Sequence, residues 1–184
     1  MSPSSESFRP SLRTRGTLLA SARFASLVFA GMFAGFLITV LVLELSMGDA
    51  DGAVYTQVRH VELIAMDVLA TVTLVPAIIA TATVTVLYHR TSTAGRRLVA
   101  VALLLLALIV IVTALVNLPI NADQRDWLIT APPQNWADIR DRWQLAHAAR
   151  TAAAVIAFGC AVFAETVGTR TRRAFVTESP DEQE

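Results

Sequence analysis

The chain has 184 residues, of which 54% are hydrophobic, and its 15 basic and 15 acidic residues give a formal net charge of zero. This length suits one domain, but the composition is too apolar for an ordinary soluble domain. A balanced charge provides no field that would draw the chain to nucleic acid, so no nucleic-acid partner is expected. The single cysteine, Cys160, excludes an intrachain disulfide.

Four long apolar runs follow one another along the chain. They cover residues 22–46, 61–88, 98–120 and 143–167. Each meets the roughly 20 residues that a helix needs to cross about 30 Å of hydrocarbon. We therefore expect an all-α integral membrane protein, a four-helix bundle whose surroundings are the lipid bilayer.

The two ends of the chain are polar. The start of the chain and its acidic last residues have too little apolar surface to pack. We predict a disordered N-terminus over residues 1–21, a four-helix domain over residues 22–169 and a disordered tail over residues 170–184.

Arginine positions predict the orientation in the membrane, since every basic residue is an arginine. Ten of them lie before the first helix, between the second and third, or after the fourth. The other five are Arg59, Arg125, Arg140, Arg142 and Arg150. Because cytoplasmic loops carry the excess of basic residues, both termini are predicted to be cytoplasmic, in a multi-pass protein of the cell membrane.

Polar residues gather at the predicted outer end of every helix, whereas the inner halves hold mostly Ala, Val, Leu, Ile and Thr. The members of this layer are Glu44 in the first helix, His60, Glu62 and Asp67 in the second, Asn117 and Asn121 in the third, and His147 and Arg150 in the fourth. Unpaired polar groups at this depth are costly and usually functional. The layer is therefore the predicted site.

Spacing indicates which of these residues can meet. Asn117 and Asn121 are four residues apart and share a helix face, and Pro119 between them predicts a kink. Trp143, His147 and Arg150 form one stripe of the fourth helix. On the second helix, the residue at position 62 is expected to point away from the face that carries position 67.

Structural interpretations of the same residues stay open. Asn117 and Asn121 are also typical of interhelical contacts in membrane bundles. Glu44 or Asp67 would pair with Arg150 if the layer only neutralises buried charge.

Asn-x-Pro-x-Asn at the end of the third helix, followed by Trp-x3-Arg-x-Arg-Trp-x3-His-x2-Arg at the start of the fourth, resembles the anthrone-oxygenase-like family of small four-helix membrane proteins. The motif is carried by Asn117, Pro119, Asn121, Trp136, Arg140, Arg142, Trp143, His147 and Arg150. The resemblance implies oxidation of an anthrone-like, aromatic polyketide-like phenol by O2. The first helix departs from the family, because Leu43-Glu44-Leu45 stands where a Met-Pro-like element is common.

For such an oxidation, His147 is the expected base, because an imidazole titrates near neutrality. Arg150 would stabilise the enolate oxygen, and Asn117 and Asn121 would orient the substrate. Trp143 would stack on the substrate.

Further side chains complete the expected substrate site. They are Glu44, Asp67 and Arg142. O2 is the expected co-substrate, and no cofactor is predicted.

Two alternatives remain. A metal-assisted oxygenase would take ligands from His60, His147, Glu44, Glu62 and Asp67. A non-catalytic bundle would bind a small molecule, act as a carrier subunit or stabilise a partner. A ligand-sized cavity beside His147 and Arg150 would favour chemistry or binding over packing.

Overall fold

The computed structural model describes residues 12–87 and 93–177. In chain order its helices are α1 (Leu12–Ser46), α2 (Gly52–Leu87), α3 (Thr93–Val112), the π-helical turn η2 (Thr113–Asn117), α4 (Leu118–Arg125) and α5 (Trp136–Thr177). Because α3, η2 and α4 follow one another without a break, they form one long span. The described residues thus contain four helical spans long and apolar enough to cross a membrane, which confirms the all-α class.

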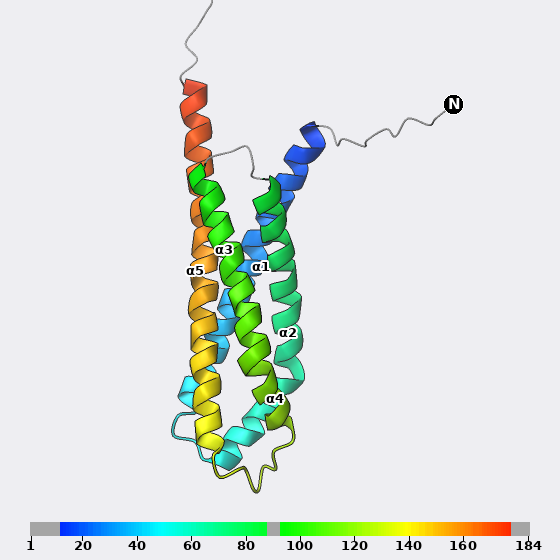
Figure 1. The fold of residues 1–184 in the computed structure, drawn as a ribbon, viewed down its shortest axis with the longest axis vertical. Helices are drawn as coiled ribbons and strands as arrows, with labels where there is room; N and C mark the ends of the chain where they lie inside the picture. The colour runs from blue at the N-terminus through cyan, green and yellow to red at the C-terminus, as the bar shows by residue number, and fades with distance from the viewer. Residues whose placement is uncertain (1–11, 88–92, 178–184) are drawn as a thin grey trace, which may run out of the picture.

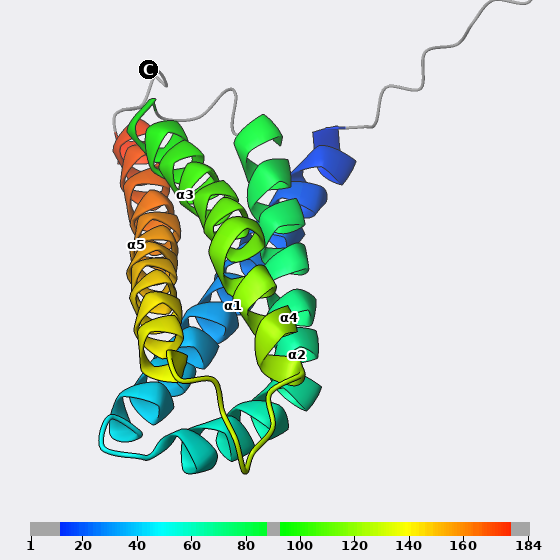
Figure 2. The ribbon, with the colours of Figure 1, turned by 60° about the horizontal axis from the view of Figure 1, so that its bottom comes forward.

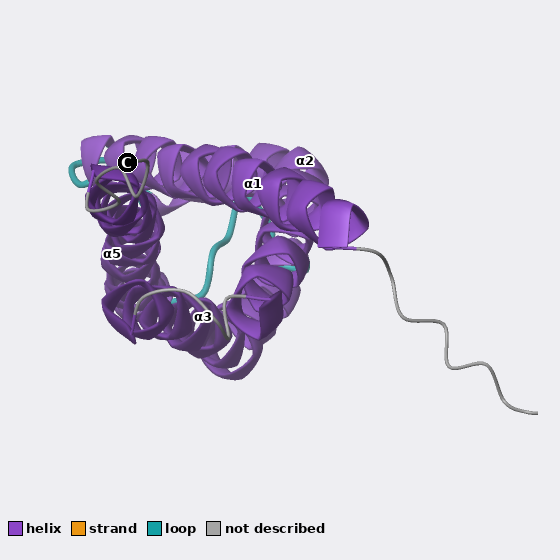
Figure 3. Cartoon of the chain, turned by 90° about the horizontal axis from the view of Figure 1, so that it is seen from above, coloured by secondary structure: helices purple, strands orange, loops and turns teal. Residues whose placement is uncertain are grey.

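The four spans surround a common axis in the order α1, α2, α3 and α5 (Figure 3). Helices that are neighbours in this order pack against each other, and α2 and α3 have the least extensive contact. The first residues of α1 and the last residues of α5 lie at the same end of the bundle (Figure 1). The opposite end, called the α4 end below, carries α4, the start of α2 and the connection from α4 to α5 (Figure 2).

The core lies where α1, α3 and α5 meet. Phe33 and Leu37 of α1 pack with Leu106 and Ile109 of α3 and with several alanines of α5. Small residues let helix backbones approach closely, as is usual in membrane bundles. Many large apolar side chains remain on the outer surface, including Ile64, which is 80% exposed. An outer surface of this kind suits a lipid environment.

The helices run farther than the apolar runs predicted. α1 includes residues 12–21 and α5 includes residues 170–177, segments for which the sequence predicted disorder. No proline lies within either helix, and helix propagation costs little once a helix is nucleated. Residues 1–11, 178–184 and Tyr88, the predicted end of the second span, lie outside the described residues.

The start of α2 also differs from the prediction, because the helix begins at Gly52 rather than near residue 61. The Asp51 carboxylate accepts a hydrogen bond from the Val54 backbone N–H at 2.9 Å, which satisfies one free donor of the first turn. A Cβ at Gly52 would lie 2.8 Å from Pro132 Cγ and 2.9 Å from Trp136 Nε1. This close approach fixes the first turn of α2 against the connection that precedes α5.

The expected irregularity at Pro119 takes the form of the π-helical turn η2, which directly precedes α4. Proline cannot donate a backbone hydrogen bond, so the regular ladder cannot continue through this position. A π-turn inserts an extra residue per turn and is frequent at functional sites. In this chain it lies where the third span reaches the polar layer.

Candidate functional site

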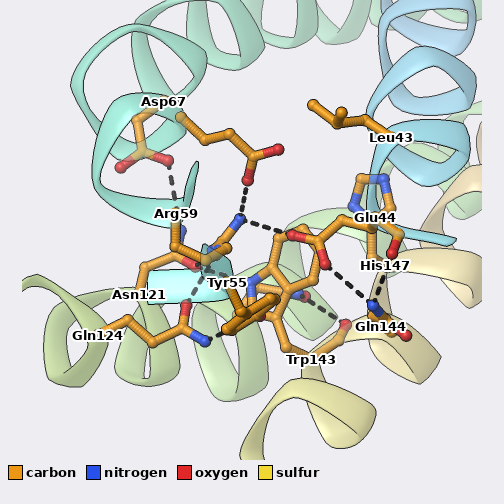
Figure 4. Close-up of polar contacts among 12 residues, drawn as sticks. Leu43, Glu44, Tyr55, Arg59, Asp67, Asn121, Gln124, Trp143, Gln144 and His147 are labelled. Carbon is orange, nitrogen blue, oxygen red and sulfur yellow. Dashed lines mark hydrogen bonds and ion pairs between the residues drawn. The ribbon is translucent and has the colours of Figure 1, made fainter. Parts of the chain in front are cut away.

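The guanidinium of Arg59 is the centre of the polar layer. It is 2% exposed and contacts side chains from α1, α2, α4 and α5 (Figure 4). Nη1 donates to Glu44 Oε1 at 3.1 Å and to Glu62 Oε2 at 2.5 Å. Nε donates to Gln124 Oε1 and Nη2 to Asn121 Oδ1, both at 3.0 Å. Four acceptors thus satisfy a charge that would be prohibitive if buried alone.

Two carboxylates share this one guanidinium. Glu44 Oε2 also accepts a hydrogen bond from Gln144 Nε2 at 3.0 Å. Glu62 has no second contact of this kind: its Oε1 is buried and has no hydrogen-bond partner within the described part of the chain. Both carboxylate oxygens of Glu44 therefore have hydrogen-bond partners, whereas among the described residues only one oxygen of Glu62 has a partner.

Asn121 links Arg59 to the fourth span. Its Oδ1 accepts from Trp143 Nε1 at 2.7 Å as well as from Arg59, and the guanidinium carbon of Arg59 lies 4.1 Å from the centre of the Trp143 ring. Asn121 Nδ2 donates to Asp67 Oδ1 at 3.3 Å. The other carboxylate oxygen of Asp67 accepts from Arg125 Nη2 at 2.6 Å, in an ion pair whose arginine is 51% exposed. Polar contacts thus run from the buried centre to the surface.

His147 and Arg150 form a second group beside the first. His147 Nε2 donates to the Leu37 carbonyl oxygen at 3.0 Å, and His147 Nδ1 accepts from Arg150 Nη2 at 2.7 Å. These contacts define a neutral imidazole with its proton on Nε2, because a carbonyl only accepts and a guanidinium only donates. Arg150 Nη1 donates to Thr113 Oγ1 of the π-turn at 2.9 Å. Arg150 Nε is buried and has no partner among the described residues.

A cavity of about 320 Å³ adjoins both groups, within the range of roughly 300–1,000 Å³ that is usual for small-molecule sites. Most of its wall is apolar and comes from α1, α2 and α3. Its polar or hydrogen-bonding lining consists of Arg59, Glu62, Asp67, Thr71, Thr113, Asn121, Trp143, His147 and Arg150. An apolar slot with a few converging polar groups is the usual form of a ligand site.

Five of the predicted site residues line this cavity, namely Asp67, Asn121, Trp143, His147 and Arg150. Asn117, Glu44 and Arg142 do not. Asn117 is buried against α5 and donates to the Trp143 carbonyl oxygen at 3.4 Å, whereas Glu44 lies among the network residues. Arg142 is exposed, because it precedes Trp143 by one residue and one helical step turns it to another face.

Sequence reasoning missed Arg59 and misjudged Glu62. The apolar pattern leaves Arg59 outside the second span, because the residue precedes the run 61–88, yet α2 begins seven positions before Arg59, at Gly52. Glu62 was expected to point away from Asp67, but both line the cavity, which is wide enough to take two adjacent stripes of α2. The three-residue spacing between Arg59 and Glu62 was a usable signal, because such pairs face each other on a helix.

In the alternative in which the layer only neutralises buried charge, Arg150 would pair with Glu44 or Asp67, and neither ion pair is present among the described residues. Glu44 pairs with Arg59 and Asp67 with Arg125.

The alternative metal set includes His60, whose Nε2 lies 3.0 Å from the Gln124 carbonyl oxygen. Among the described residues, no group of three or more histidine, cysteine, aspartate or glutamate side chains is placed to hold a metal ion.

The fold and site together define a protein with four helical spans long and apolar enough to cross a membrane, and with a buried charge network beside an apolar cavity. A comparison with protein families matches residues 65–160 to the family described as anthrone oxygenase. This match covers just over half of the 184 residues, so the chain belongs to the anthrone oxygenase family, as its motif indicated. Searches of curated proteins and of solved structures gave no match.

Proposed function

We propose that the protein is a membrane oxygenase that oxidises a planar, anthrone-like phenol with O2. The observation that carries this proposal is the cavity, whose mostly apolar wall includes Arg150 and Glu62, two side chains that each have one buried polar atom, Arg150 Nε and Glu62 Oε1, without a partner among the described residues. A mostly apolar polycycle with one carbonyl or hydroxyl edge complements such a wall. Family membership supports the same substrate class.

The reaction would proceed through the enolate of the substrate. Removal of one proton from the methylene carbon opposite the ketone leaves an electron-rich anion with its charge on the ketone oxygen. This anion reduces O2 and forms a carbon-bound hydroperoxide, and loss of water from the hydroperoxide gives the quinone. One O2 is consumed and one water is released for each quinone, so no external reductant is needed.

Arg150 is the proposed donor to the enolate oxygen. Its Nη1 and Nη2 each donate one hydrogen bond, to Thr113 and His147, and Nε is the guanidinium nitrogen without a partner among the described residues, in a side chain that lines the cavity. A donor that is held in place before the charge develops stabilises it without reorganisation.

His147 suits a positioning role better than the role of base that the sequence suggested. Its Nδ1 lone pair accepts from Arg150 and its Nε2 proton is donated to Leu37. To accept a proton, the ring would have to give up the hydrogen bond from Arg150 and become a cation beside a second cation. We therefore propose that His147 holds Arg150 in place.

We infer that the substrate enters from the bilayer, with the α4 end in the outer leaflet. Part of the cavity wall is exposed on the outer surface of the bundle, at Val75 of α2 and at Val110 and Leu118 of the third span. Arg59 is buried within α2 and Arg150 lines the cavity within α5, so neither counts as a loop arginine of the α4 end. Arg23, which lies within α1, is likewise left out of the count for the other end. The arginine excess at the other end is therefore larger than the sequence count indicated, which supports cytoplasmic termini.

An aerobic assay with a panel of anthrones and hydroquinones tests the proposed function. Purified protein in lipid nanodiscs should form the quinone from at least one anthrone, with O2 uptake and quinone formation in equal amounts. Arg150→Met should lose about 100-fold in turnover, as is usual when one preorganised donor to a developing oxyanion is removed. Binding of the anthrones without turnover would instead favour the carrier alternative, and absence of both would reject the proposal.

A further inference from the structure

Glu62 has the most unusual environment of the carboxylates in the cavity wall. Its side chain is 4% exposed, and Oε2 is held by Arg59 Nη1 at 2.5 Å. Oε1 is buried without a hydrogen-bond partner among the described residues, although buried carboxylate oxygens normally have partners. Glu62 is also among the residues that line the cavity, so a ligand seated there is the donor that we assign to this oxygen.

The other carboxylates of the layer and the imidazole in the cavity wall already accept hydrogen bonds. Both carboxylate oxygens of Asp67 accept hydrogen bonds, from Asn121 and from Arg125. Glu44 is bound by Arg59 and Gln144 and does not line the cavity. His147 Nδ1, on the fourth span, accepts a hydrogen bond from Arg150. In the described lining, the Glu62 carboxylate alone has an oxygen free to accept a proton.

We propose that Glu62 is the base that takes the methylene proton of the substrate. This inference rests on the proposed function and assigns its first step to a residue that lies outside the segment matched to the family, residues 65–160. The sequence predicted this role for His147, and here it is assigned to Glu62.

The shared guanidinium makes this proton transfer electrostatically feasible. Arg59 Nη1 contacts Glu44 and Glu62 together. When Glu62 takes a proton and becomes neutral, Arg59 still has Glu44 as its counter-ion, so no cation is left unpaired in the bundle. The negative charge moves to the substrate oxygen. The proposed donor to that oxygen, Arg150, lines the same cavity as Glu62. The total charge of the site stays constant throughout the step.

Protons and electrons balance through the whole cycle. Glu62 Oε1 takes the methylene proton as the C–H bond breaks, and the electron pair passes to the ketone oxygen. After O2 has added to the carbon, the peroxide anion takes that proton back. Glu62 then removes the second C–H proton while the O–O bond breaks, and it returns this proton to the leaving hydroxide as water. The carboxylate ends the cycle ionised.

Anaerobic hydrogen–deuterium exchange isolates the first step, because it requires deprotonation of the carbon but no oxygen. Wild-type protein in nanodiscs, incubated in D2O with an anthrone, should exchange the methylene hydrogens faster than lipid alone, as followed by NMR. Glu62→Gln keeps the shape of the side chain and should lower the rate to that of lipid alone. Glu165→Gln, at the other end of the bundle, is the matched control and should exchange as wild type does.

A second variant covers the case in which Glu62→Gln does not fold. Glu62→Ala opens space beside Arg59, and added formate should restore exchange as its concentration rises, whereas chloride at equal ionic strength should not. If Glu62→Gln exchanges the methylene hydrogens at the wild-type rate at 25 °C, Glu62 is not the base. The proposed oxygenase function would still stand. If neither exchange nor quinone formation occurs in wild type, the assignment falls together with the proposed function.

Discussion

Replacement of Arg59 by methionine tests whether the buried network holds the four spans together. Methionine fills a similar length but removes the charge and all four donated hydrogen bonds, to Glu44, Glu62, Asn121 and Gln124. Two buried carboxylates, Glu44 and Glu62, then lose the guanidinium that they share. Breaking a buried charge pair by removing one partner costs about 3–5 kcal/mol, and this network has two carboxylates to leave unpaired. We expect a loss of unfolding free energy near the upper end of that range.

The measurement is the unfolding free energy in mixed micelles, titrated with a denaturing detergent and followed by tryptophan fluorescence. Trp143 is a suitable reporter, since its ring contacts the Arg59 guanidinium and its Nε1 donates to Asn121. Arg59→Lys should recover only part of the loss, because an ammonium cannot reproduce the planar fork of a guanidinium.

Arg125→Met is the matched control. Arg125 makes a shorter ion pair than Arg59 makes with Glu44, with an N–O distance of 2.6 Å to Asp67, but its side chain is 51% exposed. Exposed ion pairs contribute about 0–1 kcal/mol, so this variant should unfold almost as wild type does. Equal losses in Arg59→Met and Arg125→Met would refute the argument that burial determines the energy of the network.

Three further variants test other parts of the structure. Gly52→Ala should lower the unfolding free energy by about 1–3 kcal/mol, because the added Cβ overpacks against Pro132. Gly35→Ala has nothing within 4 Å of the added Cβ and should raise the unfolding free energy by up to about 1 kcal/mol in the same titration. Val110→Trp should lower kcat/KM by about 100-fold by blocking the exposed part of the cavity wall, while Val101→Trp, equally exposed on the same helix, should keep wild-type kinetics. His147→Gln offers one acceptor and one donor in place of the two ring nitrogens, so it should retain most of the turnover that His147→Ala loses; equal losses in both would restore the imidazole as the base.

The spans and the polar layer were readable from the sequence because each rests on a local signal. An apolar run of sufficient length predicts a span wherever the neighbouring helices lie, and a charge such as Glu44 stands out within such a run. The stripe of Trp143, His147 and Arg150 depends only on helical periodicity, and all three residues line the cavity.

The partners within the layer could not be read in the same way. Glu44 and Asp67 each had several arginines within conceivable reach, and the choice among them depends on how each helix is rotated about its axis. The first turn of α2 depends on Gly52 contacting Pro132 and Trp136 from a distant segment, so Arg59 could not be placed from the apolar pattern. Only tertiary packing determines these features.

The shared guanidinium also bears on how the chain enters the membrane during synthesis. α1 emerges first and carries Glu44, whose counter-ion Arg59 follows 15 residues later in α2. An isolated α1 would expose an uncompensated acid to lipid, whereas a hairpin of α1 and α2 carries its own neutralising pair. The first two spans are therefore suited to insert as one unit, and Asn121 and Gln124 complete the coordination of Arg59 only when the third span arrives.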